Sequence, residues 1–143
     1  MKKERTKSCI WSVALYGSET WTLGKNEERI VNAFETWCWR RMLKIKWTNR
    51  ITNNEVFQRA KEERLLLKIL KNRRHSWMGH TVRHNEFVVN ILEGATFGKK
   101  EVGRPRLQYL KQVTRNTGAD SYTATKRISC NKSRWKAANQ SKD

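Results

Sequence analysis

The stretch Asn26–Ile45, with the sequence NEERIVNAFETWCWRRMLKI, is the most strongly patterned part of the chain. Asn26 suits the N-cap of a helix, and the two glutamates that follow suit its positively polarised first turn. A rotation of about 100° per residue gathers most of the large apolar side chains into one arc. The pattern predicts a helix over residues 27–45 that turns Trp39 to the opposite side, places Arg41 inside the arc near the helix end, and buries Ile30, Val31, Phe34, Trp37, Cys38, Met42 and Ile45.

The remaining sequence also favours helices, because it has a single proline and few runs of β-branched residues. Thr52-Asn53-Asn54-Glu55 has the form of a capping box and predicts a short helix that ends near Ala60. Further helices are expected over residues 9–16, 62–83 and 87–92, and from Pro105 onward. The expected fold is therefore all-α, an irregular basic bundle of about six short-to-medium helices.

Three segments are expected from these patterns. Residues 1–25 form an N-terminal helix and turn, and residues 26–117 form a basic helical module. Residues 118–143 form a weakly patterned and weakly ordered basic tail, because the helical pattern fades after Gly118.

The composition defines the class of partner. The 143 residues include 31 Lys and Arg against 13 Asp and Glu, which gives a net charge of +18. Seven tryptophans argue for a folded chain, and the charge argues for a polyanionic partner. The longest uncharged stretch, Ser8–Ser18, is too short to span a membrane. The three cysteines are predicted to be buried thiols in a reducing compartment.

The charge is concentrated between Arg40 and Arg83, which includes thirteen Lys and Arg against three Glu, a net charge of +10. Tryptophans are interleaved with these cations, and that combination suits contacts with phosphates and with unpaired bases. The alternative interpretation is an ordinary solvated helix surface. We predict a nucleic-acid-binding surface formed by Trp39, Arg40, Arg41, Lys44, Lys46, Arg50, Arg73 and Arg74. Arg41 and Trp37 could instead be structural, with Arg41 extending its head toward a helix C-terminus.

Gly103-Arg104-Pro105-Arg106 is a second candidate for nucleic-acid contact. An extended Gly-Arg-Pro segment suits the narrow minor groove of A·T-rich DNA, so Arg104 and Arg106 join the predicted contacts. The alternative, which the sequence favours, is a loop in which Pro105 opens a helix.

No self-sufficient catalytic site is predicted. Asp occurs only at Asp120 and Asp143, so the sequence lacks the clustered carboxylates that two-metal phosphoryl transfer requires. Walker and Rossmann phosphate loops are absent as well, and no cofactor is expected. His80 and His84 stand one helical turn apart and could chelate zinc, but two partly buried histidines bonded to backbone carbonyls are the favoured interpretation. We therefore predict no metal site.

An ordered series of short motifs resembles the C-terminal region of non-LTR (LINE-type) retrotransposon endonuclease–reverse transcriptases. The motifs span roughly residues 10–115 and are Ala14-Leu15-Tyr16-Gly17-Ser18-Glu19-Thr20-Trp21, Phe34-Glu35-Thr36-Trp37-Cys38-Trp39-Arg40-Arg41-Met42-Leu43, Trp47-Thr48-Asn49-Arg50-Ile51-Thr52-Asn53, Trp77-Met78-Gly79-His80, Ile91-Leu92-Glu93-Gly94, and Gly103-Arg104-Pro105-Arg106 with Tyr109-Leu110. The segment before Pro105 has fewer arginines than the family pattern, and the match fades beyond Asn116.

The resemblance implies a helical thumb and the basic segment behind it, separated from the upstream endonuclease and the paired catalytic aspartates. The parent RNA-directed DNA polymerase copies RNA into DNA at a nicked chromosomal target, and this part would grip DNA and RNA as template–primer or target site. It implies a nuclear location with cytoplasmic assembly, and the upstream polymerase domain as a further partner. We expect a truncated element copy or a fragment. The alternative is an inert or domesticated helical remnant that binds other proteins.

Overall fold

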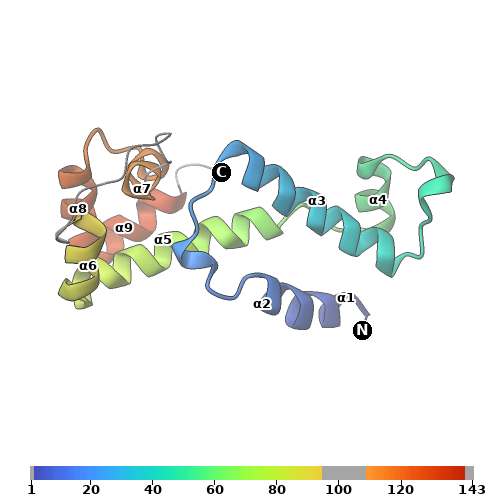
Figure 1. The fold of residues 1–143 in the computed structure, drawn as a ribbon, viewed down its shortest axis with the longest axis horizontal. Coiled ribbons are helices and arrows are strands. Elements are labelled where there is room, and N and C mark those ends of the chain that lie inside the picture. The colour runs from blue at the N-terminus through green and yellow to red at the C-terminus, as the bar shows by residue number, and fades with distance from the viewer. Residues whose placement is uncertain (1, 95–108, 141–143) are drawn as a thin grey trace. The chain divides into compact units, whose positions relative to one another are not determined.

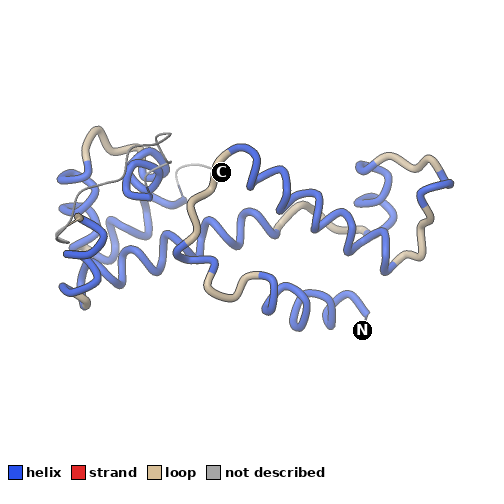
Figure 2. The backbone as a smooth tube through the Cα atoms, viewed as in Figure 1, coloured by secondary structure: helices blue, strands red, loops and turns tan. Residues whose placement is uncertain are grey.

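The computed structural model describes residues 2–94 and 109–140. These residues form helices joined by turns, as Figure 1 shows, and they contain no strand (Figure 2), which confirms the all-α prediction. The helices are somewhat more numerous than expected: α1 (Lys2–Arg5), α2 (Trp11–Ala14), α3 (Lys25–Met42), α4 (Asn53–Ala60), α5 (Leu66–His84), α6 (Glu86–Glu93), α7 (Tyr109–Thr117), α8 (Tyr122–Cys130) and α9 (Lys132–Gln140). A π-helical turn at Thr6–Ile10 joins α1 to α2, and short 3₁₀ turns occupy Ser18–Thr20 and Trp47–Asn49.

The chain divides into two compact units. The first comprises Met1–Ser18 and Leu23–Lys71, and the second comprises Glu19–Thr22 and Asn72–Asp143. Helix α5 contributes its first residues to the first unit and the remainder to the second. These units follow other boundaries than the three segments expected from the sequence.

Helix α3 is present, and the predicted residues Val31, Phe34, Cys38, Met42 and Ile45 are buried or packed against the core, but the buried face is rotated from the predicted one. Its buried residues are Glu35, Thr36, Cys38 and Trp39. Two members of the predicted core arc face solvent instead, since Ile30 is 60% exposed and Trp37 is 56% exposed. The helix also begins at Lys25, so that Gly24 and not Asn26 occupies its N-cap.

A buried carboxylate explains this rotation of α3. Glu35 is fully buried, and its Oε1 atom accepts hydrogen bonds from the backbone N–H groups of Leu65 (3.0 Å) and Leu66 (3.2 Å). These two groups lie at the start of α5, where backbone donors have no partner within their own helix. Glu35 therefore caps α5 from another helix. A charged residue in the buried stripe is invisible to a pattern that counts apolar side chains.

Trp39 lies at the centre of the first unit because it shares a helix face with Glu35, four residues earlier. It is fully buried and meets Trp11 edge to face, with 6.1 Å between ring centroids. The same core contains Leu15, Leu23, Val56, Phe57, Ala60, Leu66 and Leu70.

The capping box that precedes α4 is confirmed. Thr52 Oγ1 accepts from the backbone N–H of Glu55, and the Glu55 carboxylate accepts from the backbone N–H of Thr52. The helix ends at Ala60, as expected. Helix α6 likewise ends before Gly94, which adopts the left-handed conformation (φ 84°) that glycine allows.

The second unit is organised around Trp135, which is 3% exposed and packs with Met78 and Val113. Its indole Nε1 donates to the carbonyl of His75 (2.7 Å), and the two rings stack with 4.0 Å between centroids. The His75 Nε2 atom lies 2.7 Å from the carbonyl oxygen of Trp135, and burial lowers the pKa of His75. Residues 122–140 thus form two helices, in contrast to the weakly ordered tail expected from the sequence.

Replacement of Glu35 by Gln should change how stability depends on pH. Burial raises the pKa of Glu35 above its usual 4.5, although hydrogen bonds from Leu65 and Leu66 oppose the shift. The folded state therefore holds this proton more tightly than the unfolded state, and its stabilising contribution is lost as pH rises through the folded pKa. We expect the unfolding free energy of the wild type to fall, relative to Glu35→Gln, as pH rises above about 4.5 in urea titrations.

Glu55→Gln serves as a control of opposite sign, because the hydrogen bond from the Thr52 backbone lowers the pKa of Glu55. Glu35→Ala should instead destabilise at every pH, by about 1–3 kcal/mol, since two backbone donors lose their acceptor. A difference between wild type and Glu35→Gln that does not vary with pH would contradict this account.

Gly79→Ala should destabilise the second unit. A Cβ atom at this position of α5 would overlap the Nε1 and Cδ1 atoms of Trp135. Alanine normally stabilises a helix by about 1 kcal/mol relative to glycine, but this overlap should reverse the sign and cost about 1–3 kcal/mol. Thermal unfolding followed by circular dichroism would measure it, with exposed Ser76→Ala in the same helix as the control. A stabilised Gly79→Ala variant would refute the tight packing of Trp135.

Candidate nucleic-acid interface

The basic residues after α3 occupy a sharply defined turn. Lys44 N–H donates to the carbonyl of Arg41 (3.2 Å), and Ile45 N–H donates to the carbonyl of Arg40 (3.0 Å). This pair of bonds is a Schellman motif, in which the residue at Lys44 must take a left-handed conformation. Its φ of 55° is one that glycine usually provides, so the helix ends on an exposed lysine held in a strained backbone.

The following residues form the tip of this turn. Trp47–Asn49 makes a single 3₁₀ turn closed by the hydrogen bond from Asn49 N–H to the carbonyl of Lys46 (3.1 Å). Arg50 then takes the left-handed conformation with φ 45°. The Trp47 side chain is 89% exposed, and Lys46 and Arg50 on either side of it are exposed as well. We call residues 44–50 the basic turn.

Arg40 braces the basic turn. Its Nη2 atom donates to the carbonyl of Ile51 (2.5 Å) and to the Oδ1 atom of Asn53 (3.0 Å). The guanidinium thus ties the last turn of α3 to the residues that follow the basic turn. This is a structural role that the sequence did not reveal.

A third residue with a strained backbone follows the end of α4. Lys61 has φ 50°, and its N–H donates to the carbonyl of Gln58 (3.0 Å). In the part of the chain that the structure describes, the non-glycine residues with positive φ are Lys44, Arg50 and Lys61. Every one is an exposed cation of the first unit. Strained backbone of this kind persists where the surroundings enforce it, and it often accompanies function.

Two of the predicted contact residues are inaccessible. Trp39 has no exposed surface because it forms the core of the first unit, so it offers no face to a base. Arg74 is only 3% exposed, with its guanidinium 4.9 Å from the centroid of the Tyr109 ring and its Nη2 atom 3.3 Å from Gln112 Oε1. Burial raises the pKa of Tyr109, and the nearby Arg74 opposes that shift. The expectation that these two side chains are available to nucleic acid is wrong.

The other predicted contacts divide into three groups. Arg41 is exposed and lies 5.8 Å above the ring of Trp37, which itself stacks on Phe34. Arg73 is exposed on α5 within the second unit. Arg104 and Arg106 lie outside the described residues.

The histidine pair and two of the three cysteines differ from expectation. His80 and His84 are both exposed, with 4.8 Å between ring centroids, so they are not the partly buried pair that the sequence favoured. Among residues 2–94 and 109–140 no group of three or more metal-binding side chains comes together. Cys38 is buried, and burial raises its pKa, whereas Cys9 and Cys130 are exposed.

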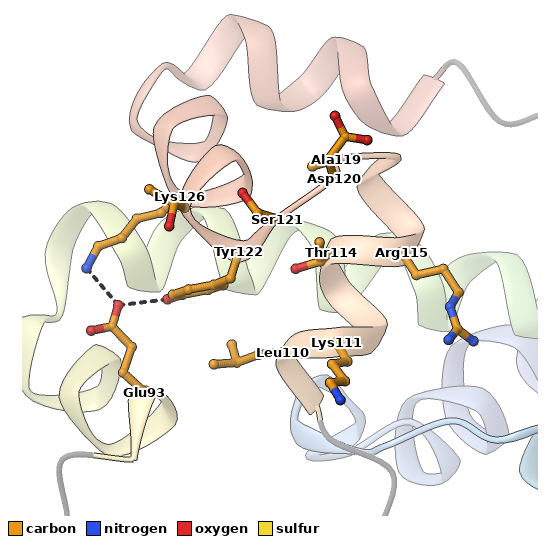
Figure 3. A pocket seen from close by; sticks show the side chains of 11 residues that line it. Glu93, Leu110, Lys111, Thr114, Arg115, Ala119, Asp120, Ser121, Tyr122 and Lys126 are labelled. Atoms are coloured by element: carbon orange, nitrogen blue, oxygen red, sulfur yellow. Dashed lines mark hydrogen bonds and ion pairs between the residues drawn. The ribbon is translucent and has the colours of Figure 1, made fainter.

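A cavity of about 960 Å³ opens in the second unit between α6, α7 and α8. Figure 3 shows Glu93 at its edge, where the carboxylate accepts from Lys126 Nζ (2.7 Å) and from the Tyr122 hydroxyl (3.0 Å). The hydrogen bond from Lys126 lowers the pKa of Glu93, and burial raises that of Tyr122. The lining also includes Lys111 and Arg115 together with Asp120, so its acidic and basic side chains are nearly balanced, and the cavity offers an anion less than the basic turn does.

In the described parts of the chain, no helix combines the length and the apolar character needed to cross a membrane. No family model, curated protein or solved structure matches the chain. The resemblance to retrotransposon reverse transcriptases therefore stays a prediction that rests on the motifs quoted above.

Lys44→Gly should raise stability and weaken binding to nucleic acid. Glycine relieves a left-handed backbone that costs lysine about 1–2 kcal/mol, although it also adds entropy to the unfolded chain. We expect a net stabilisation of about 0.5–1 kcal/mol in urea unfolding, together with a shallower salt dependence of binding by about one unit of slope. Lys68→Gly, in the first turn of α5, is the contrasting control, because it removes the same charge from a right-handed helical backbone and should destabilise. An unchanged affinity for Lys44→Gly would remove Lys44 from the interface.

Proposed function

We propose that the chain binds nucleic acid through the basic turn of its first unit, as the thumb and post-thumb segment of a non-LTR retrotransposon reverse transcriptase. In this proposal it grips template–primer or target DNA, acts in the nucleus after cytoplasmic assembly, and is not catalytic by itself. The observation that carries the nucleic-acid part is the exposed, unneutralised cluster of Lys44, Lys46 and Arg50. The ordered motifs support the retrotransposon part.

The charge of the basic turn is available because nothing near it in sequence opposes it. No acidic residue occurs from Thr36 to Asn54, and the next one, Glu55, accepts the backbone hydrogen bond of its capping box. Lys44, Lys46 and Arg50 form no ion pair with any described residue, whereas Lys7 and Lys71 pair with Glu62 and Glu28. Unpaired surface cations in a fixed turn are suited to phosphates, which release counterions when they bind.

The salt dependence of binding tests this proposal. If the basic turn and exposed cations elsewhere in the chain together contact about 6–10 phosphates, log K should fall against log salt with a slope of roughly −4 to −9. The measurement is fluorescence anisotropy of labelled DNA duplex, RNA–DNA hybrid and single strand, titrated with the full chain from roughly 50 mM salt upward. Undetectable or salt-insensitive binding to all three probes would overturn the proposal.

Substitutions at two adjacent arginines sharpen the same experiment. Arg73→Glu changes an exposed residue, so it should leave thermal unfolding unchanged. It should lower the affinity for nucleic acid if the second unit also contacts phosphates. Arg74→Glu is unsuitable as a binding test, since it would bury a carboxylate against Tyr109 and destabilise the second unit.

Protein interaction is the second candidate function. Val13 is 78% exposed and Tyr16 is 86% exposed at the end of the N-terminal helical segment, and Ile10 is 44% exposed there. Exposed apolar side chains of this kind mark surfaces that contact other proteins. A helical remnant that acts only by docking would bind no nucleic acid, and reversal of the charges in the basic turn would change none of its interactions.

A further inference from the structure

We infer that Trp47 stacks on an unpaired base, so that the basic turn recognises single-stranded nucleic acid or unpaired strand ends. This inference rests on the proposed function and specifies the form of nucleic acid that the same surface takes.

The exposure of Trp47 has no structural explanation within its unit. The tryptophans that build the cores, Trp11, Trp39 and Trp135, are at most 4% exposed, whereas Trp47 is 89% exposed. Burial of an aromatic ring is among the largest favourable contributions that a single side chain makes to folding. A tryptophan at the tip of a turn, in contact with water on nearly its whole surface, is available to stack on a ligand.

The charges beside the ring indicate the chemistry of that ligand. Lys46 precedes Trp47, Lys44 stands three residues before it, and Arg50 stands three residues after it. All three are exposed, and the absence of acidic residues from Thr36 to Asn54 leaves them unopposed. A ring face between cations matches a polymer that alternates aromatic bases with phosphates.

The turn is also held in place before any ligand arrives. The Schellman motif at Lys44 fixes one side, the left-handed Arg50 fixes the other, and Arg40 links α3 to Ile51 and Asn53. A site whose backbone is already ordered loses less entropy on binding. The basic turn therefore presents the ring of Trp47 without a folding step.

The geometry favours unpaired over paired bases. In a duplex the base faces are covered by their neighbours, and only base edges and phosphates are open to a protein. A single projecting indole reaches a base face only where the base is unstacked or at a strand end. Lys44, Lys46 and Arg50 can contact phosphates of either form, but the contribution of Trp47 is specific to the unpaired one.

The experiment compares a labelled oligo(dT) strand with a duplex of equal length by fluorescence anisotropy, using the full chain. Trp47→Ala should lower affinity for the strand about five- to 150-fold, which is the loss of one stacked base, and change duplex affinity far less, since a duplex offers base faces only at its two ends. Trp47→Phe should retain most of the affinity for the strand because it keeps a ring. Tyr16→Ala is the matched control, since Tyr16 is 86% exposed in the same unit but has no Lys or Arg between residues 8 and 24.

The possible results separate this inference from the proposed function. The stacking role is refuted if Trp47→Ala lowers the affinities for strand and duplex equally, or lowers neither of them. Nucleic-acid binding by the basic turn still stands in that case, provided that Lys46→Ala weakens the binding of both probes. If the wild type binds neither probe at roughly 50 mM salt, both the inference and the proposed function are refuted. A third result would overturn the inference: the chain binds phosphatidylserine vesicles with an affinity that depends on Trp47, while its affinities for the strand and the duplex do not differ. The basic turn would then be assigned to a membrane surface.

Discussion

The contact of the Glu35 carboxylate with the start of α5 determines how the first unit is arranged. Two backbone donors at Leu65 and Leu66 need an acceptor, and a side chain from α3 supplies it. Once Glu35 faces inward, residues three and four positions further along the helix must share its face. Trp39 and Cys38 are buried for that reason, and Trp37 is left outside. The cost is a desolvated carboxylate whose second oxygen has no hydrogen bond from any described residue.

The rotation of α3 also decides which cations are available. Arg40 is directed to the residues after the basic turn and is used to hold them, whereas Arg41 remains at the surface beside Trp37. Lys44 and Arg50 accept strained backbone conformations and keep their side chains exposed. Glycine or asparagine at these left-handed positions would be more favourable for stability than lysine or arginine. The cations therefore argue for a role of this surface in binding.

In the second unit, one aromatic side chain connects helices that are distant in sequence. Trp135 fills the space that Gly79 leaves beside α5, and it exchanges hydrogen bonds with His75. Arg74 is buried in the same unit against Tyr109, where the aromatic ring stabilises the cation. None of these contacts can be recognised from hydrophobic periodicity, since each is made by one residue on each side and not by a repeating pattern.

The helical class of the fold, and those helix ends that depend on neighbouring residues, follow from the amino-acid sequence alone. Thr52 and Glu55 cap α4 across three residues, and Gly94 ends α6 within one turn, so local pattern is sufficient for both. The sequence also locates the basic stretch from which the candidate interface is built. The burial of Trp39 and Arg74 and the exposure of Trp47, in contrast, follow from long-range packing. The backbone group that Glu35 binds lies thirty residues further along the chain, and local periodicity does not indicate which face of a helix such a distant contact will bury.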